Sequence, residues 1–294
     1  MNYRHAFHAG SFADVVKHAV LARILVHLRG KPAAFRVIDT HAGAGLYDLA
    51  GPEASRSLEW HAGIHRLLNF PVGEGARALL APYLDVVSGL NAVGRLTAYP
   101  GSPALTRAFL RPQDRLIACE TEPNAAAALA RNFARDRRVK VVAIDGWTAL
   151  NAYVPPPERR GLILVDPPYE EADDFTRLAR GLEAAHRKWA GGIYLMWYPI
   201  KGRHEPDTLA RRLARSGIAK ILRAELSVAQ NPDDRKMRDA QVRGEGPLGG
   251  CGLIVVNPPW RLAGELATLL PELAAILSGA GAGSHRLDWL AGEN

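Results

Sequence analysis

RVIDTHAGAG, residues 36–45, joins a short apolar run typical of a strand to a loop with two closely spaced glycines. Gly43 and Gly45 allow the backbone to turn tightly and to approach a ligand closely. A dinucleotide-binding loop of the G-x-G-x-x-G type would have a third glycine at position 48, where this chain has Asp48. An NAD-binding protein is therefore disfavoured, and residues further along the chain must identify the ligand.

Seven β-rich apolar runs recur along the chain, most of them separated by segments with helical periodicity. The alternation predicts an α/β protein with a mostly parallel sheet covered on both faces. Turn-forming residues fill 229–250, so we expect the last two strands to form an antiparallel pair. This order of seven strands is typical of Rossmann-like methyltransferases. The predicted strands are 36–39, 115–119, 140–144, 162–165, 192–198, 219–228 and 252–256.

Residues 46–100 interrupt the alternation between the first two strands. LEWHAGIHRLLN and ARALLAPYLDVVSGL have the periodicity of short amphipathic helices, so this stretch is predicted to be an inserted helical subdomain. Behind it, YPGSP predicts a helix with Ser102 as N-cap and Pro103 in the first turn. We expect the main domain to comprise 1–45 and 101–278, and residues 279–294 to be a loosely held C-terminal tail.

The composition is that of a folded protein. The chain has 294 residues, of which 48% are hydrophobic and 23% charged, which excludes wholesale disorder. Two cysteines cannot build a disulfide framework or a cysteine-based zinc site. No apolar run is long enough to cross a membrane, and no secretory signal core is found, so we expect a cytoplasmic protein.

The net charge of +7 suits a polyanionic partner. The excess is concentrated in two stretches. Residues 1–36 hold six basic and one acidic side chain, and residues 203–243 hold ten and six. These stretches favour a surface that faces nucleic acid, although a solvated basic surface remains the alternative.

Four successive predicted strands end in an acidic residue: Asp39, Glu120, Asp145 and Asp166. The ligand crevice of an open α/β sheet lies beyond the carboxyl ends of its strands, so these side chains would line one edge. S-adenosylmethionine fits such an edge. Glu120 would accept both ribose hydroxyls, Asp145 the adenine amino group, and the glycine loop would approach the methionine part. The alternative is that each acid only caps a loop.

The fourth of these strands continues into Asp-Pro-Pro-Tyr, residues 166–169, a pattern shared by amino-group methyltransferases. An adenine amino group is a poor nucleophile until two acceptors draw its N–H groups and favour a tetrahedral nitrogen. Asp166 and the Pro167 carbonyl can supply them, the prolines stiffen the turn, and Tyr169 can stack on the base. The alternative is a rigid strand exit. A second motif, Asn257 to Trp260, is predicted to be structural because it follows the antiparallel pair.

These motifs resemble the bacterial 23S ribosomal RNA adenine-N6 methyltransferases of the RlmJ type, over nearly the whole chain. The resemblance implies a class I fold, S-adenosylmethionine as cofactor, and methylation of a single adenine of 23S rRNA during ribosome maturation, with Asp166 catalytic. It further implies cofactor contacts from His18, His41, Gly43, Ser102, Glu120, Asp145, Gly146 and Asp166, and a contact of Tyr3 with the target nucleotide. The motifs that carry it are YRHAFHAGSFADVVKH, DTHAGAG, YPGSP, DPPYE and NPPW.

RNA contacts are predicted for two basic segments. Arg4 would help Tyr3 to position the flipped adenine, and the loop around Arg235, Lys236 and Arg238 could follow a phosphate backbone. The histidines near the N-terminus lack accompanying carboxylates in a metal-ligand pattern, so no metal site is expected. We expect a monomer that contacts rRNA but neither membrane nor metal.

Three other functions remain open at this stage. A methyltransferase acting on DNA or another RNA, or on a protein glutamine, would use the same tetrapeptide chemistry, but no familiar DNA-reading module is found. A non-catalytic RNA-binding module would explain the charge, yet it would give the aligned acids no purpose.

Overall fold

The computed structural model describes residues 5–228, 248–279 and 283–292. A single sheet of eight strands forms its centre, in the order β10-β8-β9-β7-β6-β1-β4-β5. β1, β4, β5, β6 and β7 are parallel, whereas β9 runs antiparallel between β7 and β8. The strands are β1 (Arg36–Asp39), β4 (Arg115–Cys119), β5 (Val139–Val142), β6 (Gly161–Val165), β7 (Ile193–Ile200), β8 (Ile221–Ser227), β9 (Gly250–Val256) and β10 (Ser284–Ala291).

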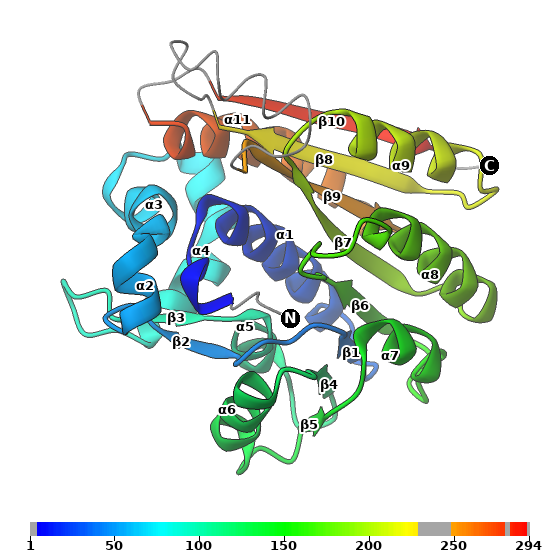
Figure 1. Ribbon diagram of the computed structural model, residues 1–294, viewed down its shortest axis with the longest axis horizontal. Helices are drawn as coiled ribbons and strands as arrows, with labels where there is room; N and C mark the ends of the chain where they lie inside the picture. Colours follow the sequence, from blue (N-terminus) through cyan, green and yellow to red (C-terminus); the bar gives the residue numbers. More distant parts are fainter. Residues whose placement is uncertain (1–4, 229–247, 280–282, 293–294) are drawn as a thin grey trace.

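The eighth strand corrects one prediction. Residues 279–294 were expected to be a loose tail, but β10 pairs with β8 in antiparallel fashion at the edge of the sheet (Figure 1). The buried Arg223 of β8 forms a two-pronged ion pair with Asp288 of β10, at 2.9 and 2.7 Å. Without β10 this charge, which is only 3% exposed, would keep only a 3.9 Å contact with Glu225 among the described residues.

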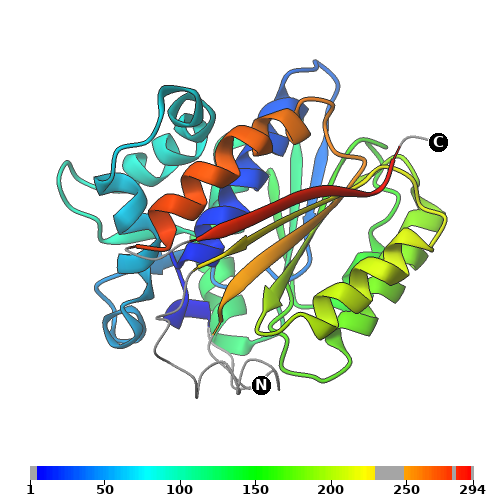
Figure 2. The ribbon, with the colours of Figure 1, turned by 90° about the horizontal axis from the view of Figure 1, so that it is seen from above.

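Helices cover both faces of the sheet (Figure 2). One face packs against α1, α5, α6 and α11, and the other against α7, α8 and α9. Figure 1 shows α1 at the centre of the molecule, and its apolar residues are buried on nearly all sides, which is typical of a helix inside a core. The bounds are η1 (His5–Phe7), α1 (Phe12–Arg29), α5 (Ser102–Phe109), α6 (Pro123–Phe133), α7 (Gly146–Ala152), α8 (Asp174–Lys188), α9 (His204–Ala214) and α11 (Leu262–Leu277).

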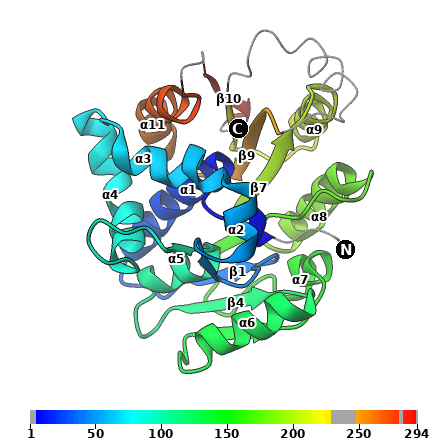
Figure 3. The ribbon, with the colours of Figure 1, turned by 60° about the vertical axis from the view of Figure 1, so that its left-hand side comes forward.

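The insertion after β1 is helical, as its periodicity predicts (Figure 3), and it begins and ends in two short strands that pair with each other (Figure 1). Its helices pack on α1 and α11, and its buried side chains belong to the same core cluster as α1 and one face of the sheet. The insertion therefore has no separate core. Its elements are β2 (Leu46–Asp48), α2 (Pro52–Ser57), η2 (His61–His65), α3 (Arg66–Asn69), α4 (Glu74–Gly89) and β3 (Ala98–Pro100).

The helix predicted behind YPGSP is α5, with a small correction at its start. Gly101 is the N-cap, and Ser102 is already the first helical residue. The Ser102 hydroxyl does not cap the helix but donates a 2.7 Å hydrogen bond to Asp39 at the end of β1. The start of α5 is thus fastened to the carboxyl edge of the sheet.

Candidate active site

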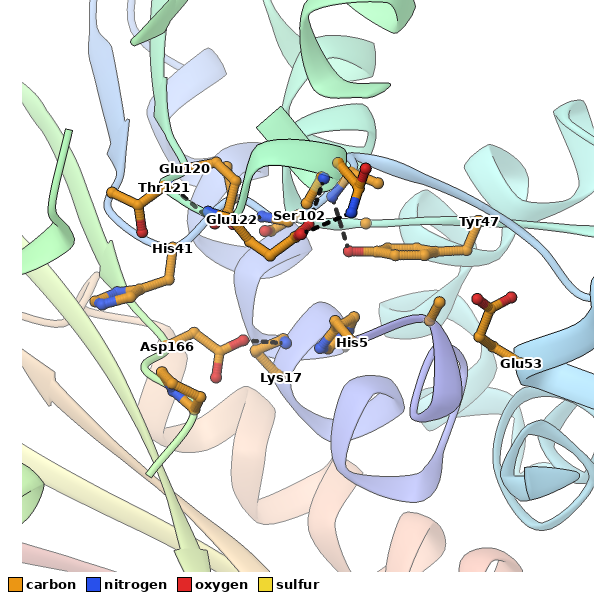
Figure 4. A pocket seen from close by; sticks show the side chains of 18 residues that line it. His5, Lys17, His41, Tyr47, Glu53, Ser102, Glu120, Thr121, Glu122 and Asp166 are labelled. Atoms are coloured by element: carbon orange, nitrogen blue, oxygen red, sulfur yellow. Dashed lines mark hydrogen bonds and ion pairs between the residues drawn. The ribbon is translucent and has the colours of Figure 1, made fainter. Parts of the chain in front are cut away.

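A cavity of about 370 Å³ opens at the carboxyl edge of β1, β4 and β6 (Figure 4). Its walls come from the N-terminal segment with α1, the glycine loop, Glu53 of α2, the start of α5, and the ends of β4 and β6. Its charged lining comprises four carboxylates and one lysine, in addition to two histidines. Those residues are His5, Lys17, His41, Glu53, Glu120, Glu122 and Asp166.

The glycine loop and Glu120 hold each other in place. The Gly43 amide donates to Glu120 Oε2 at 2.8 Å, and the amides of Thr121 and Glu122 donate to Oε1 at 2.8 Å each. Gly43 has a φ of +59°, and a Cβ there would collide with the Tyr47 hydroxyl. Glycine is therefore required at this position, and the carboxylate is oriented before any ligand binds.

Lys17 of α1 lies between two acids, the buried Asp14 and the partly exposed Asp166. Its ammonium contacts Asp14 Oδ1 at 2.8 Å and also binds Asp166 Oδ2 (Figure 4). Burial alone would lower the pKa of Lys17, but Asp14 and Asp166 raise it well above its usual value. Asp166 Oδ1 makes no hydrogen bond with the described residues, so this oxygen can accept one from a ligand.

The N-terminal segment is fixed to the same cluster. His5 Nε2 lies 3.1 Å from Asp14 Oδ2, which also accepts the Gly10 amide at 3.0 Å. Burial would raise the pKa of Asp14, but Lys17 and the neighbouring histidines hold it well below its usual range. His5 packs against the Tyr47 ring, with centroids 5.2 Å apart. Residues at the start of the chain thus form one wall of the cavity.

Asp39 lies beneath this cavity without lining it. It is fully buried, accepts the Ser102 hydroxyl through Oδ2, and has no partner for Oδ1 among the described residues. Burial raises its pKa to about 7. His41 is also affected by burial, which lowers its pKa to about 4. The neutral imidazole in the wall does not repel a cationic ligand.

The Asp166–Tyr169 loop has two sides. Asp166 and Pro168 line the cavity. Tyr169, which was expected to stack on the target base, lies outside this lining and points toward β7, where its hydroxyl donates to the Trp197 carbonyl at 2.8 Å. The Pro167 carbonyl accepts no hydrogen bond from the described residues. Asp166 Oδ1 therefore remains available as an acceptor in the cavity wall, and the Pro167 carbonyl is an unused acceptor next to it in the chain.

Five residues predicted to contact the cofactor line the cavity: His41, Gly43, Ser102, Glu120 and Asp166. Three others lie outside its lining. His18 is buried on α1 and shares a 2.8 Å hydrogen bond with the Tyr99 hydroxyl. Asp145 is the N-cap of α7, where Oδ2 accepts the Thr148 amide and hydroxyl, and Gly146 packs against the His41 ring. The RNA candidates Tyr3, Arg4, Arg235, Lys236 and Arg238 lie outside the described residues.

The second proline motif lies at the opposite edge of the sheet, because β9 is antiparallel. The Asn257 amide donates to the carbonyls of Ala190 at 2.7 Å and Gly192 at 2.8 Å. It thereby joins the end of β9 to the turn before β7. These contacts support the prediction that this motif is structural.

Sequence reasoning missed Lys17, Asp14 and Tyr47. The signal available was an aspartate and a lysine three residues apart inside FADVVKHAVLARILVHL, an otherwise apolar helix. Residues 1–36 were expected to supply a basic outer surface, but Lys17 is 3% exposed and points inward. Arg23 is also paired, with Glu265 of α11 at 2.8 Å.

The described residues hold no candidate metal site and no candidate membrane-spanning helix. Within 5–228, 248–279 and 283–292, no group of three His, Cys, Asp or Glu side chains could hold a metal ion. In the same part of the chain, no helix has the length and hydropathy needed to span a membrane.

The sheet has the antiparallel β9 inserted between β7 and β8, which is the arrangement of class I S-adenosylmethionine-dependent methyltransferases. The acidic cavity lies at the sheet edge where that class binds its cofactor. Within this class, the family model described as "RsmJ: Ribosomal RNA large subunit methyltransferase D, RlmJ" matches residues 32–291, and the chain belongs to that family. It is an enzyme of the methyltransferase class.

Relatives cover the whole chain. The Ribosomal RNA large subunit methyltransferase J of Escherichia coli is 39% identical over 293 residues, and that of Haemophilus influenzae is 36% identical over 297; each alignment spans both chains completely. A solved structure from Legionella pneumophila is 31% identical with a TM-score of 0.83, covering 96% of this chain and 98% of the other. The family resemblance and the fold class expected from the sequence are confirmed.

The cavity fits S-adenosylmethionine. The cofactor is cationic at sulfur and at its amino group, and the lining contains four carboxylates, whereas its one lysine is already paired with acids. Glu120 presents an oriented carboxylate to hydroxyl donors, and the backbone around Gly43 and Gly101 leaves the surface open to close approach.

Proposed function

We propose that this protein transfers a methyl group from S-adenosylmethionine to the N6 nitrogen of a single adenine in 23S ribosomal RNA. One observation carries the proposal: Lys17 holds Asp166 through Oδ2, so that Oδ1 remains as an acceptor in the wall of an acidic cavity, next in the chain to the unused Pro167 carbonyl. The names of the full-length relatives support ribosomal RNA as the substrate. They favour it over DNA and over protein glutamine.

The cofactor would be held by Glu120 through its ribose and by the glycine loop through its methionine part, with His41 and Ser102 beside it. Asp145 and Gly146 would contact the cofactor from the start of α7, and His18 would contact it from α1, beneath the N-terminal wall. When bound, S-adenosylmethionine supplies an electrophilic methyl group on a cationic sulfur. Every other part of the chemistry depends on how the chain orients the adenine.

Asp166 Oδ1 and the Pro167 carbonyl would each accept one N–H of the adenine amino group. This pair of hydrogen bonds localises the lone pair on N6 and directs it toward the cavity. Lys17 keeps the Asp166 carboxylate from rotating, because Oδ2 stays bound to its ammonium. After methyl transfer, one N6 proton passes to Asp166 Oδ1. Tyr3 and Arg4 would hold the target nucleotide, and Arg235, Lys236 and Arg238 its backbone.

Nucleoside analysis of 23S rRNA from cells with and without the gene tests the substrate. We expect one N6-methyladenine to disappear from the rRNA without the gene and to return when the wild-type gene is restored. An unchanged rRNA accompanied by loss of N6-methyladenine from DNA, or of methylglutamine from a protein, would contradict the proposal.

We further propose a cytoplasmic monomer that needs no metal and has a helical insertion at 46–100 within the methyltransferase domain. Light scattering on the purified protein tests the oligomeric state, and activity in the presence of a chelator tests the metal. A stable dimer, or loss of methylation on chelation, would overturn the respective part.

A further inference from the structure

A second cavity of about 370 Å³ lies behind the Asp166–Tyr169 loop, between the ends of β6 and β7. Its lining shares no residue with that of the first cavity. The loop itself is the common wall, because Asp166 and Pro168 line the first cavity and Tyr169 lines the second. A ligand in the second cavity would therefore be a close neighbour of a group at Asp166.

Fixed aromatic rings form one side of the second cavity. The hydroxyl of Tyr169 is bound to the Trp197 carbonyl, and its ring centroid lies 4.8 Å from that of Phe175. Pro199, at the end of β7, adds a further apolar surface. Rigid rings of this kind provide a stacking surface for a nucleic-acid base, independent of its sequence.

The other side carries an unpaired cation. Lys201 makes no ion pair or hydrogen bond with the described residues. In the same lining, Glu205 Oε1 lies 3.0 Å from His204 Nδ1. Glu171 adds a carboxylate, which disfavours a free anion but can accept a hydrogen bond from the amino group of a base. The lining thus suits a ligand with a planar ring and one attached anionic group.

Lys201 also lies near the N-terminal segment. The pKa of His8 is raised overall, chiefly by the hydrogen bond to Glu59, while burial and the positive charge of Lys201 act in the opposite direction.

We propose that the second cavity binds the nucleotide that directly flanks the target adenine, with its base against Phe175 and Tyr169 and its phosphate at Lys201. This inference rests on the proposed function. The target adenine itself must present its amino group to Asp166, which does not line the second cavity. The covalently linked neighbour is the ligand that the common wall brings within reach.

The first test measures binding of a 23S rRNA hairpin that carries the mapped target adenine. Phe175→Leu should raise the Kd for this hairpin about tenfold through lost stacking. Lys201→Gln should raise it and reduce the slope of log Kd against log salt by about 0.7, the value for one phosphate of a single strand. Matched controls are Phe70→Leu, an exposed ring on the insertion, and Lys31→Gln, at the opposite sheet edge; both should bind as wild type. Affinity for S-adenosylmethionine should not change in any variant.

The second test removes single bases from the hairpin. An abasic site at one position next to the target should weaken wild-type binding, and Phe175→Leu should be insensitive to the same change. The subsite would be overturned if Phe175→Leu abolished the sensitivity to an abasic site only at the target position. It would also be overturned if the effects of Phe175→Leu and of the abasic site on binding were additive at both neighbouring positions. If the wild type binds the hairpin but never methylates it, the proposed function fails, and that result is distinguishable from loss of coupling alone.

Discussion

Lys17, in the second turn of the buried helix α1, forms an ion pair with Asp166 at the end of β6. This pair connects the N-terminal helix to the loop that would activate the adenine. Because Lys17 also binds Asp14, the N-terminal segment, α1 and the Asp166–Tyr169 loop share one buried charge cluster. The orientation of Asp166 therefore depends on residues about 150 positions away in sequence.

Lys17→Met should affect both stability and catalysis. Removing the cation leaves Asp14 and Asp166 without their partner, which typically costs about 3–5 kcal/mol for a buried pair. Urea unfolding and single-turnover methylation, corrected for folded fraction, measure the two effects. Adding Asp14→Asn to Lys17→Met should restore part of the stability but not the rate. A Lys17→Met enzyme with wild-type rate would show that Asp166 needs no support from α1.

Glu120→Ala should weaken S-adenosylmethionine binding by about 1–3 kcal/mol, because the ribose hydroxyls lose an acceptor in a buried site. The same change removes the partner of the Gly43 amide, so the glycine loop should also lose order. Calorimetric titration measures the affinity, with Glu74→Ala on the outer side of α4 as the control. Equal affinities for Glu120→Ala and wild type would remove Glu120 from the cofactor site.

Asp39 should make stability depend on pH. Its folded pKa of about 7 exceeds the unfolded value of 3.8, so the stabilisation is complete below about pH 4 and is lost as pH rises to about 7. About three units at ~1.4 kcal/mol each set an upper limit of about 4 kcal/mol. Asp39→Asn keeps a partner for Ser102 and should flatten this slope in urea unfolding, becoming more stable than wild type at pH 8. Parallel profiles for the two proteins would contradict this role of Asp39.

Asn257→Ala should lower the free energy of unfolding by about 1–2 kcal/mol, because two carbonyls lose their donor. Asn257 also has a φ of +52°, a conformation that asparagine tolerates better than alanine. Methylation per folded molecule should stay at the wild-type level. A folded but inactive Asn257→Ala protein would move the chemistry to the opposite sheet edge.

Strands were predictable where the chain has a continuous β-rich apolar run, in parallel and antiparallel pairs alike. The predicted runs 36–39 and 115–119 coincide with β1 and β4, and each of the other five overlaps its strand. β10 escaped prediction because a glycine-rich stretch precedes it and its own alternation is weak. Its place depends on the long-range pairing of Asp288 with Arg223, which no local pattern reveals.

The strand-end acids were predictable as a set, but their individual roles were not. Glu120 and Asp166 line the cavity, whereas Asp39 lies beneath it and Asp145 begins α7. Whether such a side chain faces the ligand depends on the twist of the strand end and on the next helix. The Lys17 cluster was hidden for a related reason: its members come from α1 and β6, and only the fold brings them together.

Single-turnover transfer of a radiolabelled methyl group to 23S rRNA, followed by digestion to nucleosides, tests the central claim most directly. Wild type should yield labelled N6-methyladenosine from one site. Asp166→Ala should yield essentially none while retaining its fold and most of its RNA affinity, because RNA binding is distributed over many phosphate contacts. Label appearing in N6-methyladenosine at the wild-type rate with Asp166→Ala would contradict the assignment of the catalytic site.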